Sequence, residues 1–157
     1  TKEKTKLKPL SISIAVDADS RKILDAQVSV IPSFGHLAEI SRRKYGPRKS
    51  EHKKGLDKLF KNLRYCVSPF CIIKSDQHKN YPEFIQRYFP KAEHESFKSE
   101  RGCVAGQGEL KKTKFDPIFN VNHTLATLRD NVSTTVRRSW CVTQSPVRLQ
   151  YHVKTFV

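Results

Sequence analysis

Apolar and small polar residues alternate in the first part of the chain. Leu10–Val16 reads Leu-Ser-Ile-Ser-Ile-Ala-Val, which has the two-residue period of a strand with one buried face. Residues 17–21 follow as a turn, and residues 23–31 are a second apolar segment that Pro32 ends. This order predicts an antiparallel hairpin. The two aspartates of the turn are most simply turn-forming residues.

Helical periodicity begins after the hairpin. Residues 36–40 fit one or two helical turns, and the leucines and phenylalanine of residues 53–64 recur at i, i+3, i+4 and i+7. The second pattern predicts a helix that packs on a sheet and shows lysines outward. Further helices are expected from Asn122 onward, where leucines and valines recur at helical spacing, and over residues 147–157.

The central stretch predicts a strand, a polar turn and a helix. Residues 70–73 read as a short buried strand, and the apolar positions of residues 84–89 have helical spacing. Residues 92–97 form a short edge strand at best. Asp76 follows the first strand, where open α/β sheets hold ligands and catalytic groups. A helix cap is the simpler interpretation of Asp76, and a metal ligand or base is the alternative.

The charge of the chain points to a polyanionic partner. Its 157 residues are enough for one domain with a real core, and 30 Lys and Arg against 15 Asp and Glu give a net charge of +15. No core requires such an excess, and neutralising phosphates would release condensed counterions. Nucleic acid is therefore the expected partner. A membrane is not, because the sequence has neither a spanning apolar run nor a basic amphipathic helix with a broad apolar face.

The cysteines of the chain bear on its cellular location, and its lack of methionine bears on its extent. The four cysteines form no C-x-x-C pair, which favours isolated reduced thiols. With no visible signal peptide, we expect a cytoplasmic protein. The chain has no Met and opens at Thr1 inside a polar run, so we expect it to be a piece of a longer polypeptide.

Two segments have the composition of a phosphate-binding surface. In residues 42–49 cations surround Tyr45, which is available for stacking, although a solvated basic loop fits equally well. Residues 101–112 combine three glycines with cations and predict a loop that faces nucleic acid, but not a Walker loop. The cations that we expect to contact nucleic acid are Arg42, Arg43, Lys44, Lys111, Lys112, Arg137 and Arg138.

Asn122 and Arg129 form the strongest pairing for chemistry. They are seven residues apart, which is two helical turns, so both project from one helix face. A metal-binding oxygen beside a phosphate-binding cation suits an enzyme of DNA strand transfer. Taken singly, Asn122 is more simply a helix cap and Arg129 a solvated charge.

Seven segments follow one another along nearly the whole chain. They are residues 6–11, Gly35-His-Leu-Ala-Glu-Ile-Ser-Arg-Arg-Lys-Tyr-Gly46, Ser75-Asp-Gln-His-Lys-Asn-Tyr-Pro82, residues 101–112, Phe115-Asp-Pro-Ile-Phe119, Asn122-His-Thr124 and Arg137-Arg-Ser-Trp-Cys141. Together they resemble bacterial insertion-sequence transposases, and more closely the catalytic domain of the DDE-superfamily branch related to the shortest insertion elements. The resemblance implies an α/β, ribonuclease-H-like fold. Its five-stranded mixed sheet would have helices on both faces, the hairpin as its second and third strands and residues 70–73 as its fourth.

The resemblance also implies a mechanism. Such enzymes hold two Mg²⁺ (or Mn²⁺) ions with three residues, one ion activating water or a 3′-hydroxyl and the other stabilising the leaving oxygen. Asp76 matches the second acid, Asn122 the third position and Arg129 the basic residue seven places on. The first Asp would lie before Thr1, and Glu109 is a reserve ligand.

The implied function is DNA nicking and strand transfer at insertion-element ends by a homo-oligomer. A non-catalytic, basic nucleic-acid-binding module on the same fold is the alternative, since it explains the charge without any chemistry.

Overall fold

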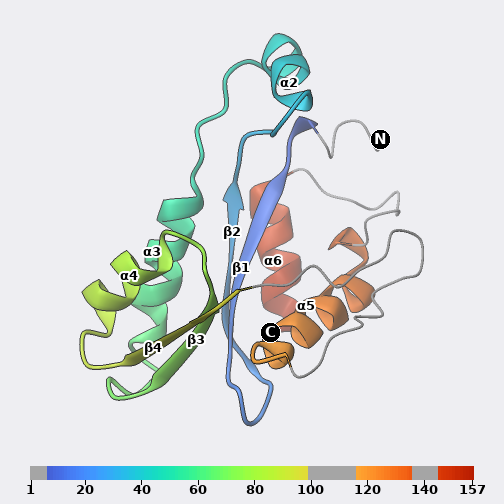
Figure 1. Cartoon of the computed structure of the whole chain (residues 1–157). Helices are drawn as coiled ribbons and strands as arrows, with labels where there is room; N and C mark the ends of the chain where they lie inside the picture. The colour runs from blue at the N-terminus through green and yellow to red at the C-terminus, as the bar shows by residue number, and fades with distance from the viewer. Residues whose placement is uncertain (1–6, 99–115, 136–144) are drawn as a thin grey trace. The chain divides into compact units, whose positions relative to one another are not determined.

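The computed structural model describes residues 7–98, 116–135 and 145–157 (Figure 1). The chain divides into two compact units, unit 1 with Thr1–Cys66 and Asn120–Val157 and unit 2 with Val67–Phe119. The elements of unit 1 are β1 (Leu10–Val16), β2 (Ile23–Val30), α2 (Leu37–Tyr45), α3 (His52–Leu63), α5 (Phe119–Asn131, from its second residue), the short 3-10 helix η1 (Ser133–Thr135) and α6 (Pro146–Phe156). Unit 2 contains β3 (Ile72–Asp76), α4 (Tyr81–Tyr88) and β4 (Glu93–Phe97).

β1 and β2 form the antiparallel hairpin that the alternating pattern predicts. Leu10 pairs with Val30, and the register shifts only near the turn, between Ala15 and Val16. In the turn, the Asp17 carboxylate accepts hydrogen bonds from the N–H and the hydroxyl of Ser20. These bonds hold the pKa of Asp17 below its ordinary value. The structural role expected for this aspartate is confirmed.

Both faces of the hairpin are covered within unit 1. The apolar face packs on a core formed with α5 and α6, whose buried members are Ala26, Leu128, Val132, Leu149 and Val153. The opposite face carries small polar residues, yet Ser13, Gln27 and Ser29 are also buried. The expectation of one buried face was therefore wrong, because alternation reports the polarity of each face and not whether a helix covers it.

α3 lies against the polar face and approaches it closely at a glycine. A Cβ atom on Gly55 would stand 1.9 Å from the Ser29 hydroxyl oxygen, so a larger residue would displace that side chain. Further along, Asn62 Nδ2 donates to Asp25 Oδ2 at 2.8 Å. The expected helix is confirmed, and its four buried residues are Leu56, Leu59, Phe60 and Leu63.

A side chain of α6 closes the outer edge of β2. Gln150 Oε1 accepts from the Val28 N–H at 2.7 Å, and Gln150 Nε2 donates to the Ala26 carbonyl at 2.8 Å. A neighbouring strand would make this same pair of bonds. At the end of β2, the Glu51 N–H donates to the Val30 carbonyl at 2.8 Å. Three backbone groups on the outer edge of β2 are thus bonded without another strand.

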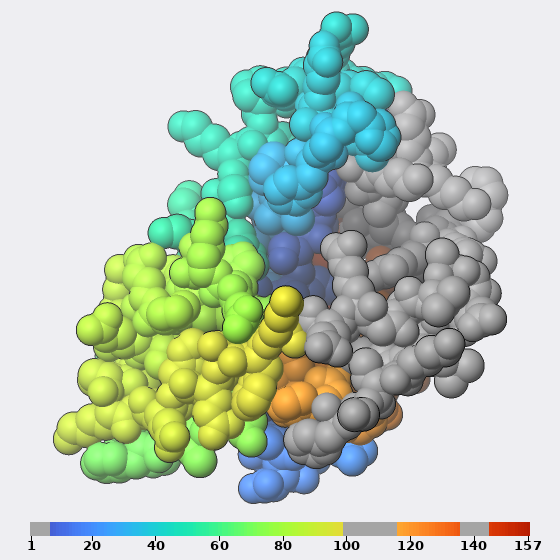
Figure 2. All heavy atoms as spheres, in the orientation of Figure 1, coloured from blue at the N-terminus to red at the C-terminus, as the bar shows by residue number. Residues whose placement is uncertain are grey.

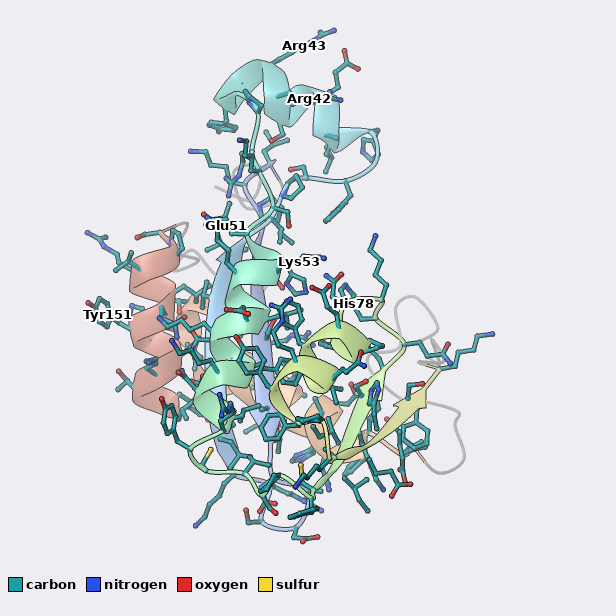
Figure 3. The ribbon with its side chains drawn as sticks, turned by 90° about the vertical axis from the view of Figure 1, so that its left-hand side faces the viewer. Arg42, Arg43, Glu51, Lys53, His78 and Tyr151 are labelled. Carbon is teal, nitrogen blue, oxygen red and sulfur yellow. The ribbon has the colours of Figure 1, made fainter. Side chains whose placement is uncertain are left out.

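We expect Gln150→Leu to lower the free energy of unfolding by about 2 kcal/mol, because it leaves one partly buried donor and one partly buried acceptor of β2 without partners. Urea unfolding followed by circular dichroism measures the change. Tyr151→Ala is the matched control, since the next side chain along α6 is 69% exposed and points away from the core (Figure 3). Its stability should change by less than about 0.5 kcal/mol. Equal stability of Gln150→Leu and the unmodified chain would contradict this role.

Unit 2 is a strand, a helix and a second strand, with β3 and β4 parallel in the register Ile72 to Glu93 and Asp76 to Phe97. α4 buries Phe84 and Ile85, which confirms the helix expected there. The edge strand expected over residues 92–97 is confirmed as β4. The predicted strand at residues 70–73 is displaced, since β3 begins at Ile72. It is also not buried, because the Ile72 side chain is 57% exposed.

The five-stranded mixed sheet of the expected ribonuclease-H-like fold is wrong for the described residues. They form two sheets of two strands each, one antiparallel and one parallel. One physical reason lies at β2, whose outer edge is taken by Gln150 and Glu51. A second lies in β3, where every other residue is exposed although the apolar run predicted a buried strand.

Candidate functional site

The cationic segment Arg42–Tyr45 lies in α2, which Figure 1 shows beyond the end of the hairpin. One backbone oxygen holds this region together. The Leu7 carbonyl accepts hydrogen bonds from the hydroxyls of Ser33 at 2.9 Å and Ser41 at 2.6 Å. Leu7 and both serines are buried. We call Leu7, Lys8 and residues 33–45 the α2 tip.

The α2 tip directs its cations into solvent. Arg42, Arg43 and Lys44 are all exposed, and Figure 3 shows the two arginines at the outer end of unit 1. The Arg43 guanidinium makes an ion pair at 2.6 Å with Glu39 one turn earlier. An exposed pair of this kind contributes little to stability, so Arg43 can change partners at low cost.

Tyr45 is less accessible than its neighbours. The Lys8 ammonium lies 4.4 Å from the centre of its ring, within cation–π range, which covers one face. The Tyr45 hydroxyl is buried and makes no hydrogen bond within the described part of the chain. The contact adds a fourth cation to the α2 tip and leaves at most the other face of the ring for a base.

α3 continues the basic surface of unit 1. In the space-filling view, side chains of α2 and the following segment, in cyan, extend into solvent (Figure 2). The lysines that were expected on the outside of α3 are exposed, namely Lys53, Lys54, Lys58 and Lys61. Lys54 is partly neutralised by Glu51 at 3.4 Å.

Asp76 is exposed at the carboxyl end of β3. Its Oδ1 atom accepts a hydrogen bond from the His78 N–H at 3.0 Å, which fixes the turn that leads to α4. The residue at the cap position of α4 is Asn80, whose side chain makes no capping bond. Asp76 therefore shapes the turn and is not the helix cap that the sequence favoured.

Ser75, the residue before Asp76, makes two polar contacts. The Ser75 hydroxyl donates to the Asp76 carbonyl at 2.8 Å and lies 2.9 Å from His94 Nε2 on β4. Because the hydroxyl has one hydrogen, His94 Nε2 is the donor in the second bond. Burial raises the pKa of Tyr81 to about 12, with a smaller contribution from the Asp76 charge. Asp76 is thus electrostatically coupled to the start of α4.

Stability should fall at high pH because of Tyr81. Its pKa is about 12 when folded and 10 as the ordinary value, so the stabilisation is complete below pH 10 and lost as pH rises through 12. The full loss is about 2 to 3 kcal/mol. Urea unfolding at pH 9 and pH 11.5 should show a larger loss for the unmodified chain than for Tyr81→Phe, which cannot ionise. Parallel losses in both proteins would contradict the pKa assignment.

Asn122 and Arg129 both lie in α5, two turns apart, as the spacing predicts. Both are half-buried. α5 begins at Phe119, so Asn122 is in the first turn and is not the cap. The start of α5 is tied to the hairpin turn, where Asn120 Nδ2 donates to the Ala18 carbonyl at 2.6 Å.

The expected metal set is only partly described. Asp76 belongs to unit 2 and Asn122 to unit 1, and the meeting of the two side chains stays a prediction. Glu109, Lys111, Lys112, Arg137 and Arg138 lie outside the described residues. Over residues 7–98, 116–135 and 145–157, no three His, Cys, Asp or Glu side chains are grouped as a metal ion would require.

Sequence reasoning missed the residues that assemble the α2 tip. Lys8, Ser33 and Ser41 are not close in sequence, and a serine that donates to a distant carbonyl has no local signature. They are brought together by buried Leu7, whose carbonyl binds both serines and whose next residue is Lys8. Ser33 lies between Pro32 and Gly35, where a turn already explains a serine, and Ser41 directly follows the predicted helical turns of residues 36–40, so neither carried a signal of its own.

None of the helices in the described ranges has the length and apolar character to cross a bilayer. A scan of protein-family models found no family that matches the chain, and searches of curated proteins and of solved structures also found no match.

Proposed function

We propose that this chain binds nucleic acid, DNA in the first place, through phosphate contacts from the α2 tip and α3. The observation that carries the proposal is the gathering of four cations, three of them exposed, on one hydrogen-bonded support. Lys8, Arg42, Arg43 and Lys44 belong to a segment that the Leu7 carbonyl fastens from two sides. Cations presented on a fixed frame bind phosphates with little loss of conformational entropy.

The net charge of +15 supports a polyanion over an acidic peptide or a small anion. A long phosphate backbone can meet many cations at once and release a counterion at each contact. A membrane surface fits α2 less well, because its exposed positions are mostly charged and Ile40 is its one exposed large apolar residue. A DNA partner also agrees with the expected cytoplasmic location.

Removal of two α2 cations tests the location of the interface. We expect Arg42→Gln with Lys44→Gln to weaken binding to a 20-base-pair duplex, and to reduce the slope of log K against log salt by about 2. Fluorescence anisotropy across a salt series measures both quantities. The matched control is Arg148→Gln with Lys154→Gln, which removes the same charge from exposed positions of α6. If the two double variants weaken binding equally, binding depends on net charge alone and the interface is not located on α2.

Metal-dependent phosphoryl transfer of the transposase kind is a second candidate. The specific observation is the exposed carboxylate of Asp76 at the carboxyl end of a parallel strand, before the turn that leads to α4. In this proposal Asp76 is a ligand of Mg²⁺ or Mn²⁺ at the ends of an insertion element, Asn122 and Arg129 of α5 keep the metal-binding and phosphate-binding roles that the resemblance implies, and the active form is a homo-oligomer.

The described ligands do not suffice for that chemistry. Asp76 supplies one carboxylate and Asn122 one neutral carboxamide oxygen. A pair of divalent ions needs more negatively charged ligands than this. Hence the described residues do not fit the full site, and no reaction step is assigned to them. The candidate requires a further carboxylate, for which Glu109 is the reserve.

A divalent-ion titration decides whether Asp76 binds metal at all. We expect Mn²⁺ to broaden the NMR resonances of His78, whose N–H is bonded to the Asp76 carboxylate. Asp76→Asn should remove the broadening, whereas Asp19→Asn, at an exposed carboxylate in the hairpin turn, should preserve it. Absence of broadening in the unmodified chain would end the catalytic candidate and leave the nucleic-acid proposal intact.

A further inference from the structure

Phe34 is an exposed aromatic side chain on an anchored backbone. Its side chain is 71% exposed. Ser33, the residue before it, is buried and bonded to the Leu7 carbonyl. Gly35, the residue after it, has a φ of 61° and accepts a hydrogen bond from the Ala38 N–H at 3.0 Å. Both neighbours are fixed, and the ring between them is held in solvent.

The backbone that carries the ring lies close to the backbone of α2. Ser33 and Ser41 bond to one oxygen atom, so the residues that follow them, Phe34 and Arg42, extend from neighbouring points of the backbone. Ile40 on the same helix is 47% exposed. An exposed aromatic among cations is the combination found where proteins hold single-stranded nucleic acid, since cations follow the phosphates and the ring meets a base.

Two other exposed aromatic side chains offer a comparison. Phe70 is also 71% exposed, but the Lys91 ammonium lies 5.2 Å from its ring centre and occupies a face. Tyr151 is 69% exposed on α6 and has Arg148 and Lys154 as cationic neighbours, but it lies outside the α2 tip and is therefore the matched comparison for Phe34. Among the described residues, no cation or ring packs on Phe34.

We propose that Phe34 stacks on an unpaired base, so that the α2 tip engages a single-stranded or frayed segment of nucleic acid. The inference rests on the proposed nucleic-acid binding and names the form of the ligand. In an intact duplex the faces of the bases are covered by their neighbours, and an aromatic ring gains nothing there. An unpaired base offers a free face, and stacking of this kind tolerates any base.

The test compares three fluorescent ligands of one sequence: a single strand, a blunt duplex, and a duplex with an unpaired tail. We expect Phe34→Ala to weaken binding to the single strand and the tailed duplex by about 5- to 100-fold. Binding to the blunt duplex should change by less than about 2-fold. Phe34→Trp should restore affinity, and its added tryptophan fluorescence should be quenched by the single strand.

Tyr151→Ala is the control, because it removes an aromatic of nearly equal exposure from the same unit. It should leave all three affinities unchanged. Equal weakening of all three ligands by Phe34→Ala, or unchanged binding, would overturn the stacking proposal. The proposal would also be overturned if Phe34→Ala changed only the sedimentation of the free protein, because the ring would then bind a second copy of the chain. It would be overturned too if Phe34→Ala changed only the binding of anionic phospholipid vesicles, because the ring would then bind a membrane. If the unmodified chain binds none of the ligands, the proposed function itself fails.

Discussion

The hairpin of β1 and β2 has to bury two chemically different faces, and the arrangement of unit 1 follows from that constraint. The apolar face takes α5 and α6 through ordinary hydrophobic packing. The polar face accepts α3 through the close approach of Gly55 to the small side chain of Ser29 and through the hydrogen bond from Asn62 to Asp25. Two strands alone are marginal in water, so each covering helix is needed for the hairpin to persist.

The same hairpin sets where the cations are displayed. β1 is preceded by Leu7, whose buried carbonyl binds Ser33 after β2 and Ser41 within α2. The α2 tip is therefore an extension of the hairpin end and not an independent loop. Rigid support matters for a basic surface, because long cationic side chains already lose rotamer freedom on binding and a mobile backbone would add to that cost.

Most local elements of this chain and the pairing within its hairpin could be predicted from the sequence, and contacts between distant segments could not. Period-2 alternation located β1, and helical spacing located α3 and α4, because each pattern depends on neighbours a few residues away. The side chain of Gln150 shows what local patterns leave out. It closes the edge of β2 from more than 120 residues away, and a glutamine in a helix has no signature for that role. The stacking expected of Tyr45 has the same difficulty, since Lys8, which covers a face of its ring, lies far back in the chain.

Binding and catalysis make unequal demands on this structure. Phosphate binding adds up over many contacts, so a frame with several exposed cations suffices and errors of an ångström are tolerated. Phosphoryl transfer needs several carboxylates converging on ions a few ångströms apart. Asp76 meets part of that demand, since its carboxylate is exposed and held by the His78 N–H. A carboxylate at the end of a two-stranded sheet also has a sufficient structural reason to exist, because it forms the turn into α4. The exposed cations of the α2 tip add to a charge excess that no core requires, and for this reason they carry the stronger functional argument.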